Sequence, residues 1–163
     1  MNKYLIEALD SYPYDITQTL ESLEYALSYD GECAYGLCLY GRIYEEQLND
    51  YTTAIHYYEQ ALRSDVYSIV VYPHLISALL KNEDYQKAKK AIDFALKVKG
   101  MDKRQIIFLK ARMFEHTKKY SKALKALKES EEYTFDNDYQ ECLNATRTRI
   151  LEKNKSRKGT KKQ

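Results

Sequence analysis

An alanine–leucine pair recurs along the chain at an almost constant interval. Ala26-Leu27, Ala61-Leu62 and Ala95-Leu96 stand 35 and 34 residues apart. A self-similar step of about 34 residues is the period of a solenoid built from repeated pairs of helices. The spacing therefore predicts an all-α chain of stacked helix pairs.

Apolar periodicity and turn residues divide the chain into segments that agree with this period. We expect helices at residues 1–11, 16–30, 33–47, 51–64, 67–81, 85–97, 102–116, 120–132 and 136–153. Asp15, Asp84 and Asp102 are the expected N-caps of three of them. The connections within pairs are short, so paired helices should be antiparallel. Pro73 either kinks its helix or marks a later start.

Three stretches carry the same kinds of residue at equivalent positions. The first begins at Ala34 and has Leu37, Tyr40, Gly41, Tyr44, Tyr51, Ala54, Tyr58 and Ala61. The second begins at Ile69 and has Tyr72, Leu75, Ile76, Leu79, Tyr85, Ala88, Ile92 and Ala95. The third begins at Arg104 and has Ile107, Lys110, Ala111, Phe114, Tyr120, Ala123, Leu127 and Ser130. Over roughly Asp15 to Glu132 this order resembles the tetratricopeptide repeat family.

The resemblance implies a right-handed α-solenoid of antiparallel helix pairs. We expect about three full repeats, an N-terminal partial repeat and a C-terminal capping helix. They would form one domain over residues 1–152, followed by a basic disordered tail at 153–163, which has no apolar residue to order it. Ile76 replaces a small residue, so we expect looser packing there, and Ser130 stands where a further alanine is due.

In this family the first helix of each repeat lines a concave groove. The matching positions give a partner-binding surface of Tyr35, Cys38, Arg42, Glu45, Glu46, Val70, Pro73, Ser77, Leu80, Lys81, Gln105, Phe108, Arg112, Glu115 and His116. Arg42 and Arg112 are the expected anion anchors, because guanidinium forks suit carboxylate and phosphate. The Lys and Asn clamp by which some members bind chaperone tails is absent, since Cys38, Arg42, Pro73 and Ser77 occupy its positions.

These features favour a non-catalytic adaptor that binds a peptide or helix of another protein. The three histidines and three cysteines show no metal-ligand spacing, and no nucleophile or phosphate-loop motif is present. We therefore expect no enzyme activity, metal or cofactor. No apolar run is long enough to cross a membrane and the N-terminus lacks a signal sequence, so we expect a cytoplasmic protein.

Charge is strongly segregated along the sequence. Residues 1–80 hold 3 basic and 12 acidic side chains, whereas residues 81–128 hold 15 basic and 5 acidic ones. Two alternative functions follow. The basic third repeat and lysine-rich tail could bind nucleic acid or a ribosome, although basic and aromatic residues do not alternate on one face. Alternatively, the oppositely charged ends could drive homo-oligomerisation.

Overall fold

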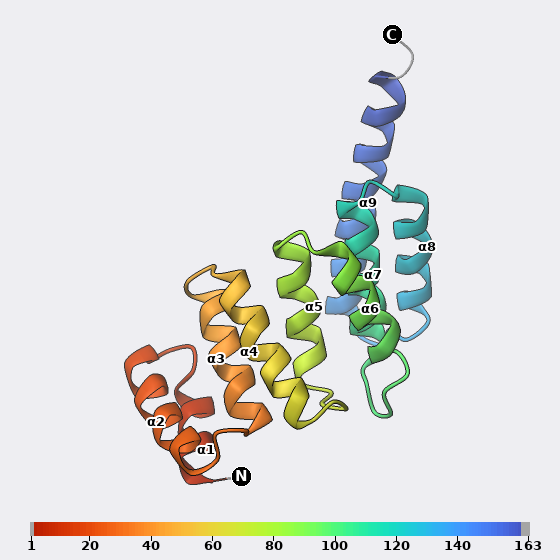
Figure 1. Ribbon diagram of the computed structural model, residues 1–163. Helices are drawn as coiled ribbons and strands as arrows, with labels where there is room; N and C mark the ends of the chain where they lie inside the picture. The colour runs from red at the N-terminus through yellow and green to blue at the C-terminus, as the bar shows by residue number, and fades with distance from the viewer. Residues whose placement is uncertain (1, 161–163) are drawn as a thin grey trace. The chain divides into compact units, whose positions relative to one another are not determined.

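The computed structural model describes residues 2–160, and all regular structure in that part of the chain is helical (Figure 1). The helices are α1 (Lys3–Ser11), α2 (Ile16–Tyr29), α3 (Ala34–Glu46), α4 (Tyr51–Ser64), α5 (Val71–Lys81), α6 (Tyr85–Ala95), α7 (Lys103–His116), α8 (Tyr120–Glu131) and α9 (Asn137–Thr160). They confirm the all-α prediction. The chain divides into two compact units: unit 1, Met1–Asn82, contains α1 to α5, and unit 2, Glu83–Gln163, contains α6 to α9.

Side-chain caps begin most of the helices where the sequence predicts them. Asp15, Asp84 and Asp102 each accept a hydrogen bond from the backbone N–H three residues on, at 2.9, 3.3 and 3.3 Å. Asn2 and Asp50 cap α1 and α4 in the same way. Each cap satisfies one of the N–H groups that a helix start leaves without a partner, which fixes where the helix begins.

Helix α5 begins at Val71, four residues later than its predicted start, and Pro73 lies in its first turn. An N–H in the first turn has no intrahelical acceptor, so proline costs no hydrogen bond there. The Tyr72 hydroxyl donates to the carbonyl of Val66 at 2.8 Å and holds the preceding loop against the helix start. Of the two predicted roles for Pro73, the late start is the one observed.

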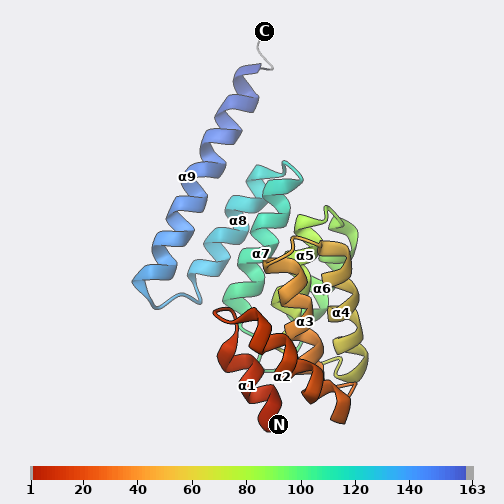
Figure 2. The same cartoon turned by 90° about the vertical axis from the view of Figure 1, so that its left-hand side faces the viewer.

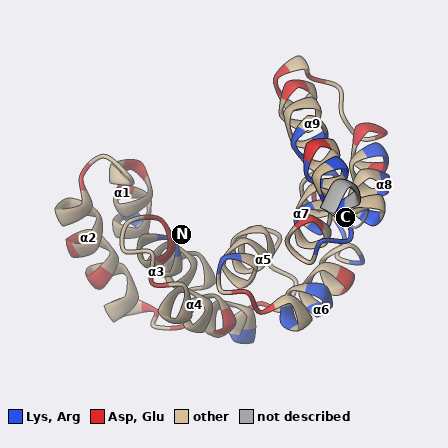
Figure 3. Cartoon of the chain, turned by 90° about the horizontal axis from the view of Figure 1, so that it is seen from above, with Lys and Arg blue, Asp and Glu red and all other residues tan. Residues whose placement is uncertain are grey.

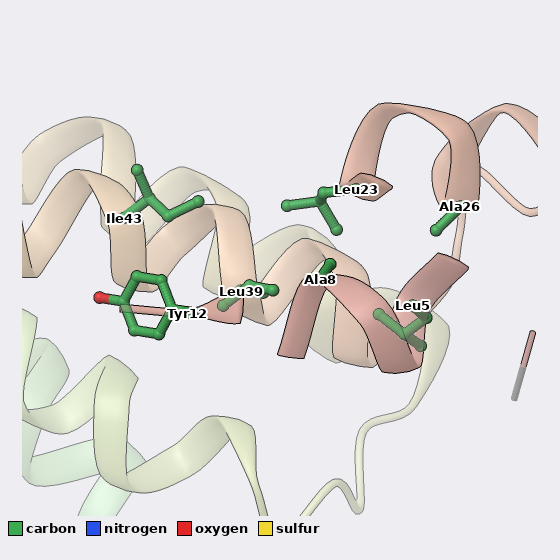
Figure 4. Close-up of a cluster of buried hydrophobic side chains, with 7 residues drawn as sticks. All are labelled: Leu5, Ala8, Tyr12, Leu23, Ala26, Leu39 and Ile43. Carbon is green, nitrogen blue, oxygen red and sulfur yellow. The ribbon is translucent and has the colours of Figure 1, made fainter. Parts of the chain in front are cut away.

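The first core of unit 1 joins α1, α2 and α3 (Figure 4). Its buried members are Leu5, Ala8, Tyr12, Leu23, Ala26, Leu39 and Ile43. Helix α4 packs along α3, and α5 packs on both of them. No pair of these helices covers its own apolar stripe, so each needs the next to complete its core.

Small residues occupy the closest helix contacts. Ala54 and Ala61 of α4 have no solvent exposure, and neither have Ala88 and Ala95 of α6. Gly41 of α3 is the tightest case, because a Cβ at this position would lie 2.4 Å from Cε1 of Tyr58. The alanine positions that define the repeat are therefore those where a longer side chain has no room.

In unit 2, α7 and α8 form an antiparallel pair, α6 packs on α7 and α9 packs on α8 (Figure 2). The core here is formed by Ile107, Ala111, Ala123, Ala126, Leu127, Leu143 and Ile150. Ser130 departs from the repeat pattern for a visible reason. Its buried hydroxyl donates to the carbonyl of Arg104 at 3.0 Å, a bond that the expected alanine could not make.

Helix α9 includes part of the tail that the sequence predicts to be disordered from Lys153 onward. The helix continues to Thr160, and residues 161–163 lie outside the described part of the chain. Two polar contacts tie this segment to α7 and the turn after it. The Lys153 ammonium donates to Glu115 at 2.6 Å, and the Arg157 guanidinium donates to the carbonyl of Lys118 at 2.7 Å. One ion pair and one hydrogen bond to a backbone carbonyl thus connect this segment, which has no apolar residue, to α7 and its turn.

None of the helices in residues 2–160 combines the length and apolar character that crossing a membrane requires.

Replacing Gly41 by alanine should destabilise unit 1, because the new Cβ would overlap the buried Tyr58 ring. We expect a loss of about 1–3 kcal/mol, the usual cost of overpacking a core. Urea unfolding followed by far-UV circular dichroism would measure it as a lower midpoint. Gly31→Ala is the control, since its Cβ would meet only the carbonyl of Leu27 at 3.6 Å. Equal midpoints for the two variants would contradict the tight contact.

Candidate functional site

The predicted groove positions of α3 have unequal access to solvent. Tyr35 is 48 % exposed, whereas Cys38 is 2 % exposed. Burial raises the pKa of the Cys38 thiol to about 12, so the side chain is a neutral packing group at physiological pH. The placement of Cys38 on an open groove is therefore wrong: position 5 of this helix packs into unit 1.

Arg42 is held by contacts inside unit 1. Its Nε donates to Glu46 at 3.1 Å, and its guanidinium lies over the ring of Tyr12, 4.6 Å from the centroid. The Tyr12 hydroxyl donates to the same carboxylate at 2.6 Å. Burial acts to raise the pKa of Glu46, but the hydrogen bonds from Arg42 and Tyr12 bring it below its usual value. The charge of Arg42 is thus neutralised by a neighbour one turn away.

A buried carboxylate connects three helices of unit 1. Glu45 of α3 is 2 % exposed and accepts hydrogen bonds from Tyr58 at 2.7 Å, Ser77 at 2.8 Å and Lys81 at 3.0 Å. We call this set of four residues the Glu45 brace. It uses Ser77, one of the predicted groove residues, as an internal donor.

Of the other predicted residues of unit 1, Leu80 lies near the end of α5 and is 2 % exposed, so its placement on an open groove is wrong. The other two lie at the start of α5. Val70 and Pro73 are half-buried there. The next residue, His74, stacks on Tyr58 with the ring centroids 6.0 Å apart, and burial lowers its pKa. It is therefore a neutral packing residue near neutral pH.

In unit 2, Gln105 is exposed at the start of α7 and Phe108 is half-buried. Phe108 meets the ring of Tyr139 edge-on, with centroids 5.9 Å apart. The Arg104 guanidinium lies over that same ring at 4.2 Å and pairs with Asp136 at 2.5 Å. These contacts fix the beginning of α9 beside α7.

A second buried carboxylate connects α7 with α9. Glu115 is 7 % exposed and accepts two hydrogen bonds from Arg149, both 2.9 Å, and one from Lys153 at 2.6 Å. The Arg149 hydrogen bonds are the largest cause that lowers the pKa of Glu115 to about 2, and Lys153 adds to them. We call these three residues the Glu115 brace.

The three residues of the Glu115 brace line a pocket of about 210 Å³ together with Arg112 and His116. Three predicted groove residues, Arg112, Glu115 and His116, meet here. Figure 3 shows that lysine and arginine are frequent on the helices of unit 2. The sequence prediction missed Arg149 and Lys153 because it treated α9 only as a solvating cap. The sequence signal for these two residues is their spacing of four, which places both on one face of a helix.

The two braces have the same construction. In each, a glutamate at position 12 of a first helix accepts hydrogen bonds from two residues, four positions apart, on a helix further along the chain. The donors are Ser77 and Lys81 in unit 1, and Arg149 and Lys153 in unit 2. Helix α9 therefore occupies the place of the first helix of a further repeat.

Within residues 2–160, no three His, Cys, Asp or Glu side chains gather closely enough to hold a metal ion. No buried side-chain nitrogen or oxygen in the described part of the chain lacks a hydrogen-bond partner.

Glu115→Gln should destabilise the protein at neutral pH and lose this effect in acid. The folded pKa of Glu115 lies below its ordinary value of 4.5, so the brace stabilises the protein above that pH and loses its contribution as pH falls from about 4.5 to about 2. We expect a difference of about 2–3 kcal/mol at pH 7 between wild type and variant. Urea unfolding at several pH values would measure it, with the exposed Glu141→Gln as control. A difference independent of pH would contradict the ionised brace.

The comparisons with known proteins agree with the repeated construction. The tetratricopeptide repeat matches residues 34–65, which contain the pair α3 and α4. A second match to the same repeat covers residues 75–137, from within α5 to the first residue of α9. No curated protein matches the sequence. The two repeat matches together cover more than half of the chain, which therefore belongs to the tetratricopeptide repeat family.

Proposed function

We propose that the protein is a non-catalytic adaptor that holds a peptide or helical segment of another protein against the first helices of its repeats. Tetratricopeptide repeats are in general protein-interaction modules. The observation that carries the proposal within this chain is the pocket on α7 and α9, where Arg112 and His116 meet at a surface open to solvent.

Each unit also has predicted groove positions with access to solvent outside this pocket. In unit 1, Tyr35 on α3 is 48 % exposed, and in unit 2, Gln105 on α7 is exposed and Phe108 is half-buried. The aromatic rings of Tyr35 and Phe108 offer apolar contact, and the amide of Gln105 and the guanidinium of Arg112 offer directed hydrogen bonds. Protein interfaces favour this mixture of groups.

The buried polar groups support a binding role rather than catalysis. Cys38, the thiol that the sequence placed on the groove, has a pKa of about 12 because of its burial and is not a thiolate at neutral pH. Glu45 and Glu115 are held by two or more donors from neighbouring helices, which gives both carboxylates a structural role.

Binding should depend on the first helices and not on the second. Selection from a displayed random peptide library, followed by calorimetry on the selected peptides, would provide ligands to test. The triple variant Tyr35→Ala/Gln105→Ala/Arg112→Ala should weaken them by tenfold or more, since interface anchors each contribute roughly 1 kcal/mol or more. The matched control, His56→Ala/Gln86→Ala/Lys128→Ala, changes exposed residues of α4, α6 and α8.

Equal affinity of the two triple variants would reject the first helices as the binding surface. A larger loss of affinity in the control variant would instead assign the binding surface to the second helices.

A second candidate function is self-association, which the charge distribution favours. Unit 1 has 4 basic and 12 acidic residues, whereas unit 2 has 22 basic and 12 acidic ones. Net charges of −8 and +10 would attract unit 1 of one copy to unit 2 of another.

Sedimentation velocity at low and moderate ionic strength would test this second function. We expect faster-sedimenting species at low salt and monomer near 0.5 M salt, where screening shortens the reach of charge attraction to about 4 Å. A monomer at low salt and high protein concentration would reject self-association.

A further inference from the structure

We propose that the pocket formed by Arg112, His116, Arg149 and Lys153 on the Glu115 brace binds a phosphorylated serine or threonine side chain of the partner segment. This inference rests on the proposed adaptor function and names the chemistry of its anchor.

The pocket has an excess of positive charge that its own residues do not neutralise. Arg112, Arg149 and Lys153 contribute three positive charges and Glu115 one negative charge. With His116 counted as neutral, the balance is +2. A phosphorylated side chain carries a charge of roughly −1.5 to −2 at neutral pH, so it matches this balance more closely than a carboxylate does.

The equivalent place in unit 1 has no such excess. There Arg42 pairs with Glu46 at 3.1 Å, and Lys81 pairs with Glu45 at 3.0 Å, so the four charges cancel. Two sequence differences produce the contrast. His116 of α7 stands where α3 has Glu46, and Arg149 occupies the donor place that Ser77 has in the Glu45 brace. The same scaffold thus carries one neutral and one cationic version of the site.

The cations of the pocket retain donors for a ligand. Arg149 uses Nε and one Nη2 hydrogen on Glu115, and Lys153 uses one of its three hydrogens. Among the described residues, no hydrogen bond or ion pair involves the side chain of Arg112, which leaves its guanidinium fork open. Glu115 meanwhile fixes Arg149 and Lys153 in position, which lowers the entropy lost on binding.

The size of the pocket also favours a small charged group. Its volume of about 210 Å³ is below the roughly 300–1,000 Å³ of pockets that enclose drug-sized molecules. A single phosphoryl group on a partner segment fits this description, while the rest of the segment would lie along the first helices.

The probe for the test is N-acetyl-phosphoserine amide, and its binding to the 163-residue chain would be followed by NMR. We expect saturable shifts of the Nε–Hε signals of Arg112 and Arg149, with the backbone spectrum of unit 1 unchanged. N-acetyl-glutamate amide is the carboxylate arm and should bind at least tenfold more weakly. A uridine hexanucleotide is the nucleic-acid arm. Its affinity should come only from the charge of its several phosphates and should therefore fall steeply as salt is raised.

Three variants make the test specific. Arg112→Gln should weaken phosphoserine binding by roughly tenfold or more, since it removes a charge-assisted donor pair. His116→Glu recreates the arrangement of unit 1, in which the acid one turn on occupies the arginine, and should abolish binding without removing a cation. Arg63→Gln, a matched change at an exposed arginine of α4, should leave the affinity unchanged. The NMR spectra themselves show whether each variant is folded.

Unchanged phosphoserine affinity in both Arg112→Gln and His116→Glu would overturn the proposal. Equal binding of the glutamate probe would also overturn it, as would a hexanucleotide that binds the same residues tightly at moderate salt.

Failure of the phosphate site is distinguishable from failure of the adaptor function. Library peptides that bind the first helices, together with no saturable shift of Arg112 or Arg149 by the phosphoserine probe, would keep the adaptor and reject the phosphate site. A phosphoserine probe that binds while no peptide does would keep the site and reject the adaptor.

Discussion

Every helix pair in this chain depends on a neighbour to bury its apolar stripe. The helices are short, and buried alanine and glycine residues leave room for the side chains of the neighbouring helix. Gly41 against Tyr58 is the extreme case. Close approach then brings the polar edge of one first helix within reach of another, and both buried glutamates lie at this edge. The braces are therefore a consequence of the helix spacing that the small residues set.

A buried carboxylate is costly unless it is paired and hydrogen-bonded. Glu45 and Glu115 meet this requirement with donors from helices other than their own, so each selects one register between the helices it joins. The two differ in what surrounds them. In unit 1 the neighbouring charges cancel, whereas in unit 2 they leave a cationic surface. A shared structural device thus carries different surface chemistry in the two units.

The sequence was sufficient for the helices, the caps and the repeat period, because these depend on residues close together in the chain. The sequence was less informative where contacts between residues far apart in the chain determine the structure. Pro73 is compatible with a kink or with a helix start, and only the packing of the loop before it chooses between them. Lys153 and Arg157 lie in a segment with no apolar residue, and their partners on α7 and its turn are more than 30 positions earlier. The burial of Cys38 likewise depends on neighbouring helices.

The two braces also separate the positions that maintain the fold from those that set the local charge. Glu115 and Lys153 correspond to Glu45 and Lys81, and these four serve the same contact in both units. The charge difference resides at His116 and Arg149, which line the pocket but do not belong to the apolar core. In evolutionary terms, a chain of this kind can change the charge of a pocket by substitutions outside its apolar core. Duplicated repeats could therefore diverge in specificity faster than in architecture.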